Sequence, residues 1–313
     1  MAIHKIIPSS KDYLWGGTKL IEHYGKTTDK EIMAESWEIS SHKDGPSILE
    51  DKGITLKEYT ETNRETVMGS KALDFDDFPI LIKFIDAKDV LSIQVHPDDE
   101  YALKHENQYG KNEMWYVLEA EPGSTLYYGV KEDISKEAFR QSIEEDRILD
   151  VLNKVEVKPG DVIYVSAGTI HAIGKGIVLC EIQQNSNVTY RVYDFKRQQS
   201  DGSYRDLHID QAVEVSNLNK VTTDFKAQGV LESYEGHTLQ VLVKSPYFVT
   251  THYAVNNKAS FNVSDESFVS VICLEGTLQF NDLTLTKGES AFIDAGTGEI
   301  SVVGLGKFLH VTL

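Results

Sequence analysis

The distribution of apolar residues along the chain is typical of a mainly β protein. Short runs rich in Val, Ile, Tyr and Phe are separated by Gly or Asx turns, which is the pattern of strands in antiparallel sheets. We expect strands at 80–85, 90–95, 113–120, 162–166, 178–184, 189–193, 238–244, 248–254, 268–275 and 290–294. Every apolar run meets a charged residue before it reaches the length needed to span a bilayer.

Helical signals are few and short. Thr55-Leu-Lys-Glu58 matches a capping box, and it predicts a helix that continues to about Val67. Further short helices are expected after Pro97, after Ser135, and around residues 148–152. The fold class is therefore mainly β with a few short helices.

Two parts of the chain repeat one pattern. Residues 116–120 resemble residues 271–276, and the sequence from Lys158 to Gly168 resembles the sequence from Lys287 to Gly296. Two copies of one β unit indicate two related barrels or sandwiches. We expect an N-terminal domain with helical insertions at residues 1–220 and a C-terminal domain at residues 221–313.

Composition narrows the classes of function. The 313 residues are 41% hydrophobic, which is enough for a substantial core, and the formal net charge of −18 argues against non-specific binding of nucleic acid. No apolar secretion signal is visible at the start, and only Cys180 and Cys273 are present, so we expect a cytoplasmic protein without a disulfide framework. An anionic ligand would require a locally positive site in so acidic a chain.

One set of residues has the chemistry of a metal site. Gln94 and His96 share one face of a predicted strand, Glu113 opens the next strand, and His171 follows a Gly-rich strand-like run. A single histidine on a strand is usually structural, so the spacing of the whole set carries the argument. Two imidazoles and one carboxylate suit zinc, the Gln94 amide oxygen can add a fourth ligand, and a position remains open for substrate.

The spacing before His171 fits a known motif. Gly160, Gly168 and His171 match the second cupin motif, Gly-x5-Pro-x-Gly-x2-His, with Ser166 in place of its proline. The first cupin motif is matched more loosely, because Gln94-Val-His96 replaces His-x-His. The fold class implied is a pair of cupin-type, jelly-roll β-barrels or sandwiches.

Further motifs point to one branch of the cupins, and over nearly its whole length the chain resembles the type I mannose-6-phosphate isomerases in their short bacterial form. The residues that carry this resemblance are Trp15-Gly-Gly17, Glu35-Ser-Trp-Glu-Ile-Ser40, Ile82-Lys83, Ser92-Ile-Gln-Val-His-Pro-Asp98, Lys111-Asn-Glu113, Gly168-Thr-Ile-His-Ala172, and Glu181 with Arg191.

The resemblance implies a ligand set and a cofactor. It implies that Gln94, His96, Glu113 and His171 hold one Zn2+ per chain, with Gln94 either coordinating the ion or lying just outside the ligands. In the second copy of the repeat Glu299 stands where the first has His171, so the C-terminal domain is expected to be metal-free.

The remaining polar candidates lie close to these ligands in sequence. Lys83 interrupts an apolar strand, and Lys111 precedes Glu113 by two residues. If residues 184–187 turn as a hairpin, Glu181 and Arg191 lie directly opposite each other, either as a plain ion pair or as active-site residues. The resemblance implies the active-site role.

The activity implied by the resemblance is the interconversion of mannose 6-phosphate and fructose 6-phosphate through a cis-enediol. Arg191 would stabilise the enediolate, and either Glu181 or Lys111 would move the proton between C1 and C2. Lys83, Ser92 and Trp15 are the candidates for substrate binding, with a core anchor as the alternative role of Trp15.

The expected partner is a small-molecule sugar phosphate, without nucleic acid or membrane, for a monomer or a homodimer. Two other classes share the same ligand set. One is an iron-dependent cupin oxygenase, since two His and one Glu also hold ferrous iron. The other is a non-catalytic cupin that binds a sugar.

Overall fold

The chain folds into two compact units that do not follow each other in sequence. The computed structural model describes residues 2–199, 201–222 and 224–313. The central unit contains Asp12–Gly17 and Ile85–Phe225, and the terminal unit contains Met1–Lys11, Thr18–Phe84 and Lys226–Leu313. The later border lies close to the expected boundary after residue 220. Residues 18–84, which we expected within the N-terminal domain, lie in the same compact unit as the C-terminal strands.

The central unit has two antiparallel sheets. Its strands are β7 (Ile93–Val95), β8 (Glu113–Ala120), β9 (Thr125–Val130), β10 (Leu152–Glu156), β11 (Val162–Val165), β12 (His171–Ala172), β13 (Ile177–Gln184) and β14 (Tyr190–Tyr193). One sheet has the order β10-β9-β12-β7-β14. In the other, β8 pairs with β11 on one side and with β13 on the other.

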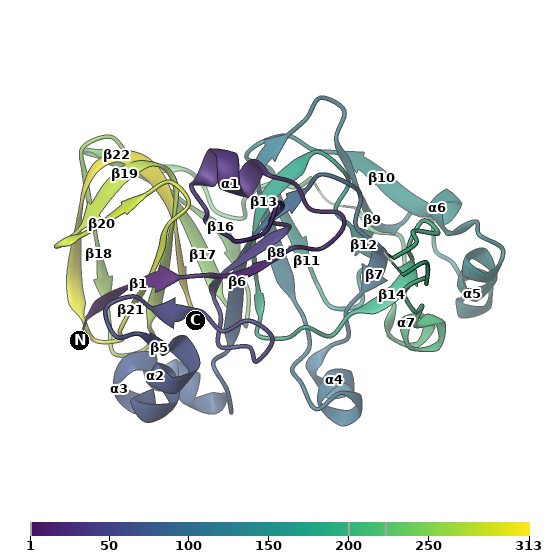
Figure 1. Cartoon of the computed structure of the whole chain (residues 1–313), viewed down its shortest axis with the longest axis horizontal. Helices are drawn as coiled ribbons and strands as arrows, with labels where there is room; N and C mark the ends of the chain where they lie inside the picture. Colours follow the sequence, from purple (N-terminus) through teal and green to yellow (C-terminus); the bar gives the residue numbers. More distant parts are fainter. Residues whose placement is uncertain (1, 200, 223) are drawn as a thin grey trace. The chain divides into compact units, whose positions relative to one another are not determined.

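Short helices complete the described part of the central unit: α4 (Asp99–His105), α5 (Lys136–Glu144), α6 (Ile148–Val151) and α7 (Ile209–Val215). Asp98 and Ser135 cap α4 and α5 through their side chains, which satisfies backbone N–H groups that have no partner within the helix. α5, α6 and α7 gather at one end of this unit (Figure 1). Apolar residues of these helices, such as Phe139 and Ala212, share a core with Ile93 and Val95 of β7.

The terminal unit is built around a long, strongly bent set of strands. These are β1 (Ile3–Ile7), β4 (Ile48–Leu49), β5 (Ile54–Thr55), β15 (Glu232–Tyr234), β16 (His237–Lys244), β17 (Val249–Val255), β18 (Lys258–Val263), β19 (Val269–Phe280), β20 (Leu283–Thr286), β21 (Ser290–Ile293) and β22 (Gly298–Thr312). β22 pairs with β17, β18 and β19, and β1 pairs with β21 and β4. These last pairings join the start of the chain to its C-terminal strands.

The remaining elements of the terminal unit are β2 (Ser9–Lys11), β3 (Glu35–Ile39), α1 (Lys19–Tyr24), α2 (Leu56–Thr62), α3 (Arg64–Met68) and a 3-10 helix (Ser70–Asp74). β6 (Ile80–Ala87) starts in this unit, and the border between the units falls within it. An apolar core that includes Val271, Phe280 and Phe308 fills the space enclosed by β17–β22.

The mainly β class with a few short helices is confirmed. β8 has the predicted bounds, and the other expected strands are present with ends shifted by a few residues. The capping box at Thr55 and Glu58 is formed, but the predicted helix is interrupted at Asn63, which separates α2 from α3. The apolar patterns did not indicate α1 or α7.

Candidate metal centre and active site

Three neighbouring strands place His171, Gln94 and Arg191 in one row. His171 on β12 is the register partner of Gln94 on β7, and Gln94 is in turn the partner of Arg191 on β14. Directly opposed residues on antiparallel strands have Cβ atoms about 4.5–5.5 Å apart. His96 follows β7 at once, so one sheet of the central unit supplies four of the predicted site residues.

The other sheet of the central unit supplies the carboxylates. Glu113 is the first residue of β8, and Trp115 lies two residues further along the same strand. Glu181 on β13 is the register partner of Trp115 and accepts a hydrogen bond of 3.1 Å from the indole Nε1. The Trp115 ring also lies edge-on to the His171 ring, with centroids 5.3 Å apart. Trp115 therefore connects Glu181 to the histidine side of the site.

The two histidines are held in one tautomer by backbone carbonyls. His96 Nδ1 donates to the carbonyl of Val188, and His171 Nδ1 donates to the carbonyl of Thr169, each over 2.8 Å. Each Nε2 atom is consequently unprotonated and can accept a hydrogen bond or coordinate a metal. These atoms lie 3.6 Å and 3.4 Å from the two carboxylate oxygens of Glu113.

This arrangement fits a metal ion. The ligand atoms of His96, Glu113 and His171 all lie within 4.8 Å of one another, and all three side chains are buried. Burial and, to a smaller extent, the charge of Lys111 together lower the pKa of His171 to about 4. The imidazole is then neutral at pH 7, which is the form that coordinates metals. A cation between these atoms would relieve the close approach of imidazole lone pairs to carboxylate oxygens.

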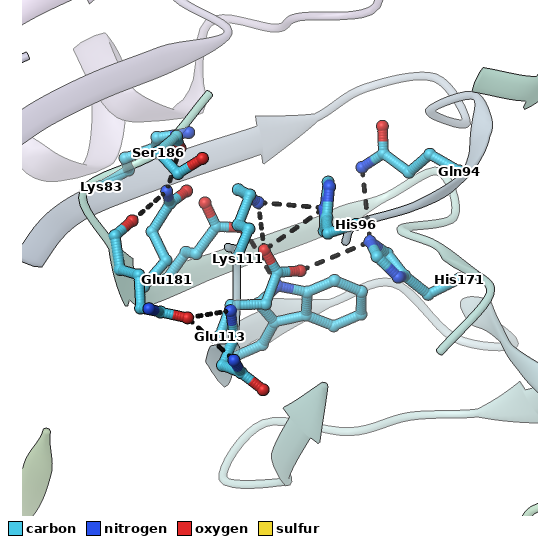
Figure 2. Close-up of polar contacts among 12 residues, drawn as sticks. Lys83, Gln94, His96, Lys111, Glu113, His171, Glu181 and Ser186 are labelled. Carbon is cyan, nitrogen blue, oxygen red and sulfur yellow. Dashed lines mark hydrogen bonds and ion pairs between the residues drawn. The ribbon is translucent and has the colours of Figure 1, made fainter. Parts of the chain in front are cut away.

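Gln94 and Lys111 border the same atoms. The Gln94 side-chain amide lies 3.4 Å from His171 Nε2, and a half-turn of that amide places its oxygen there instead. Lys111 Nζ lies 3.1 Å from His96 Nε2 and contacts Glu113 Oε2 (Figure 2). The structure thus places Gln94 and Lys111 against the three candidate ligands, as their positions in the sequence suggested.

Arg191 is the strand neighbour of Gln94, and not all of its N–H groups are engaged in hydrogen bonds within the described structure. Its Nη1 donates to the carbonyl of Asp206 over 3.0 Å, whereas its buried Nε has no acceptor among the residues that the structure describes. Burial lowers the pKa of Arg191, the nearby Arg205 lowers it further, and Asp194 and Asp206 oppose this effect. The guanidinium remains charged, because its ordinary pKa lies far above neutrality.

The expected hairpin between Glu181 and Arg191 is wrong. β13, which carries Glu181, pairs with β8, and β14, which carries Arg191, pairs with β7 in the other sheet of the central unit. The segment between them crosses from one sheet to the other and does not form a two-stranded turn. The predicted cross-strand ion pair is therefore not formed by strand pairing.

The three candidates for substrate binding have different surroundings. Ser92 is buried, one residue before β7. Trp15 is also buried, and it lines a cleft of about 230 Å3 in the central unit. Lys83 belongs to the terminal unit, where its Nζ lies 3.7 Å from Glu35 and 4.9 Å from the centre of the Trp37 ring.

Sequence reasoning did not single out Trp115 or the arginines of the Trp15 cleft, Arg197 and Arg205. Trp115 had a usable signal, since it shares a strand face with Glu113. The two arginines had none, because they lie in an irregular segment after β14.

Comparisons with known proteins now decide the family. Residues 3–123 match the family model described as phosphomannose isomerase type I, catalytic domain, and residues 238–313 match mannose-6-phosphate isomerase, cupin domain. Mannose-6-phosphate isomerase of Streptococcus mutans is 39% identical over 282 residues, covering 88% of this chain and 87% of that protein. The chain belongs to the type I phosphomannose isomerase family.

Two further relatives agree with this family. Mannose-6-phosphate isomerase ManA of Bacillus subtilis is 35% identical, covering 95% of this chain and 94% of its own. The crystal structure of the mannose 6-phosphate isomerase from Bacillus subtilis superimposes with a TM-score of 0.92 at 34% identity, covering all of both chains. The activity of this chain is therefore that of a mannose-6-phosphate isomerase.

Family membership sets the two competing classes aside. An isomerase of this family is neither an oxygenase nor a non-catalytic sugar-binding protein, although all three can use a cupin scaffold. Within the part of the chain that the structure describes, no helix of the isomerase is long and apolar enough to cross a membrane.

Proposed function

We propose that this isomerase interconverts mannose 6-phosphate and fructose 6-phosphate through a cis-enediol, with one Zn2+ per chain held by His96, Glu113 and His171. The observation that supports it is the convergence of two Nε2 lone pairs on the Glu113 carboxylate in a buried site. Gln94 adds an amide oxygen after the half-turn described above. Two imidazoles with one carboxylate are a common ligand set of catalytic zinc.

Zinc, when bound, supplies Lewis-acid polarisation of the sugar oxygens at C1 and C2. Arg191 then stabilises the negative charge that develops on the enediolate, because it is the strand neighbour of Gln94 and keeps a buried donor at Nε. Its planar fork of N–H groups suits two adjacent oxygens better than an ammonium group does.

We propose Glu181 as the base that moves the carbon-bound proton. Only 3% of its surface is exposed, and Trp115 holds one carboxylate oxygen. The carboxylate takes the proton from C2 of mannose 6-phosphate and returns it to C1, so the overall reaction neither consumes nor releases a proton. Lys111 is the alternative base, since its Nζ also lies at the candidate ligands.

The Trp15 cleft is the proposed place of the phosphate end of the substrate. It combines an aromatic wall from Tyr13 and Trp15 with the guanidinium of Arg197. Arginine and aromatic rings together bind the phosphate and the ring face of a sugar phosphate. Roles for Ser92 and Lys83 in binding substrate stay predictions that rest on the family resemblance.

A coupled assay tests the reaction and the metal together. Fructose 6-phosphate formed from mannose 6-phosphate is measured before chelation, after chelation, and after addition of Zn2+ or Fe2+. We expect turnover to disappear on chelation and to return with zinc, with about one zinc per chain by metal analysis. Unchanged turnover in a protein shown to be metal-free would exclude the proposed role of zinc.

We also propose that the isomerase acts in the cytoplasm as a monomer or a homodimer. Cys180 and Cys273 are both buried and form no disulfide, which agrees with a reducing compartment. Gel filtration with light scattering distinguishes the two oligomeric states.

A further inference from the structure

The cleft beside Trp15 combines an apolar wall with two acid and two arginine side chains. Tyr13, Leu14 and Trp15 form the apolar part, and Asp194, Arg197 and Arg205 are among the polar residues that line it. An anion can bind in such a cleft only if at least one arginine is not already neutralised by an aspartate. The pairing of these charges therefore decides what the cleft can bind.

A tight turn brings Asp194 and Arg197 to the same place. Phe195 and Lys196 both have positive φ, at 54° and 53°, and the backbone N–H of Arg197 donates to the carbonyl of Asp194 over 3.0 Å. Two positive φ values within a four-residue hydrogen-bonded turn are the pattern of type I′, which normally requires Asn or Gly. The turn holds an aspartate and an arginine close enough to attract each other.

Arg205 prevents Asp194 from neutralising the charge of Arg197. Its Nε donates to Asp194 Oδ2 over 2.7 Å and its Nη2 donates to Asp194 Oδ1, so both carboxylate oxygens are engaged. Such a two-bond pair is the strongest arrangement of guanidinium and carboxylate. The Asp194 side chain is 7% exposed, so water cannot easily replace Arg205.

Arg197 is left with one N–H group that has no hydrogen-bond acceptor in the described structure. Its Nη2 donates to the carbonyl of Val90, which fixes the guanidinium plane without neutralising its charge. Its Nη1 is buried, and no acceptor reaches it among the residues that the structure describes.

We propose that Arg205 is a positioning residue for the substrate phosphate: it binds the Asp194 carboxylate and so keeps Arg197 available to the anion. This inference rests on the proposed function, in which the Trp15 cleft takes the phosphate end of the sugar. It gives Arg205 a role that acts through Asp194 and involves no direct contact with substrate.

The test is a double-mutant cycle on the metal-loaded protein. The variants are Arg205→Ala, Asp194→Asn, and both together, with Arg205→Lys as the conservative variant. Two quantities are measured for each: the dissociation constant of inorganic phosphate by calorimetry, and kcat and KM for mannose 6-phosphate. Thermal unfolding of every variant shows whether it is folded.

We expect Arg205→Ala to weaken phosphate binding and to raise KM by about tenfold or more, with kcat changed far less, because the released carboxylate occupies Arg197. Adding Asp194→Asn to Arg205→Ala should restore most of the affinity, since the amide carries no charge. Arg205→Lys should lie between Arg205→Ala and the unmodified protein.

Equal weakening in Arg205→Ala and in the double variant would overturn the inference, because it would mean that Arg205 acts only through the shape of the loop. Unchanged phosphate binding in a folded Arg205→Ala would overturn it as well. Failure of the proposed function has a different signature: the unmodified, zinc-loaded protein would lack turnover, while the calorimetric cycle would still report on Arg205.

Discussion

Lys111 donates a hydrogen bond to the same atom of His96 that would coordinate a metal. Its Nζ lies 3.1 Å from His96 Nε2 and also contacts Glu113 Oε2. His96 Nδ1 is committed to the carbonyl of Val188, so Nε2 has one lone pair for one partner. The lysine ammonium and a metal ion therefore compete for His96 and for one oxygen of Glu113.

Replacing Lys111 by Met should increase the affinity for zinc. The change removes both a competing donor and a positive charge buried beside the ligands, and we expect about a tenfold tighter dissociation constant. Competition with a chromophoric chelator measures it. Lys104→Met, at an exposed position on α4, is the control and should leave zinc affinity unchanged. Weaker zinc binding in Lys111→Met would show that the ammonium supports the ligands.

The sequence contains enough information to single out the His–Glu–His cluster but not to describe its surroundings. His96, Glu113 and His171 were identifiable because strand alternation and motif spacing are local properties of the chain. In the structure their side chains lie together in a buried cluster. The role of each residue stays a prediction.

The errors arose where long-range pairing decides the structure. The turn after Gln184 suggested a hairpin between β13 and β14. Instead, β13 pairs with β8 and β14 pairs with β7, and both partner strands lie far away in the sequence. The placement of residues 18–84 likewise depends on long-range pairing, since β4 pairs with β1 and β1 pairs with the C-terminal strand β21. Arg197 and Arg205 lie in irregular backbone, where no periodicity marks the direction of a side chain.

Glu181→Gln should separate catalysis from metal binding. The amide keeps the shape of the carboxylate and an oxygen to accept the hydrogen bond of Trp115, but it cannot take up the proton from carbon. We expect kcat to fall by about 10²–10⁴-fold, the usual contribution of a general base, while zinc content stays at the value of the unmodified protein. Near-normal turnover would remove Glu181 from this role and leave Lys111 as the base.

Gly168→Ala should destabilise the loop that leads to His171. Gly168 has φ of +83°, its N–H donates to the carbonyl of His96, and an added Cβ would lie 2.9 Å from the carbonyl oxygen of Val215. We expect a loss of about 1–3 kcal/mol in the free energy of unfolding, measured by urea denaturation.

Gly160→Ala is the matched control for this change. Gly160 has φ of +91°, but an added Cβ would meet nothing within 4 Å. The backbone strain is thus similar and the collision is absent, so Gly160→Ala should cost less than Gly168→Ala. Equal costs would mean that strain alone accounts for the effect.

His4 in the terminal unit connects the start of the chain to two acids. Its Nδ1 lies 2.9 Å from Asp51, its Nε2 lies 3.6 Å from Asp294, and Tyr59 bonds to both His4 and Asp294. Burial by itself lowers the pKa of His4, but the hydrogen bonds and charges of Asp294 and Asp51 outweigh this and raise it. The protonated imidazole is therefore favoured in the folded protein.

The raised pKa of His4 predicts the sign of a pH effect. A group whose pKa is higher in the folded state contributes its full stability below its unfolded value of about 6.5, and loses it as pH rises through the folded value. His4→Gln should therefore lower the free energy of unfolding more at about pH 5.5 than at about pH 9. Urea denaturation of both proteins at the two pH values measures this difference, with His23→Gln at an exposed position as the control. A cost independent of pH would show that His4 stabilises the unit only as a neutral hydrogen-bonding group, and a larger cost at high pH would reverse the direction assigned to its pKa.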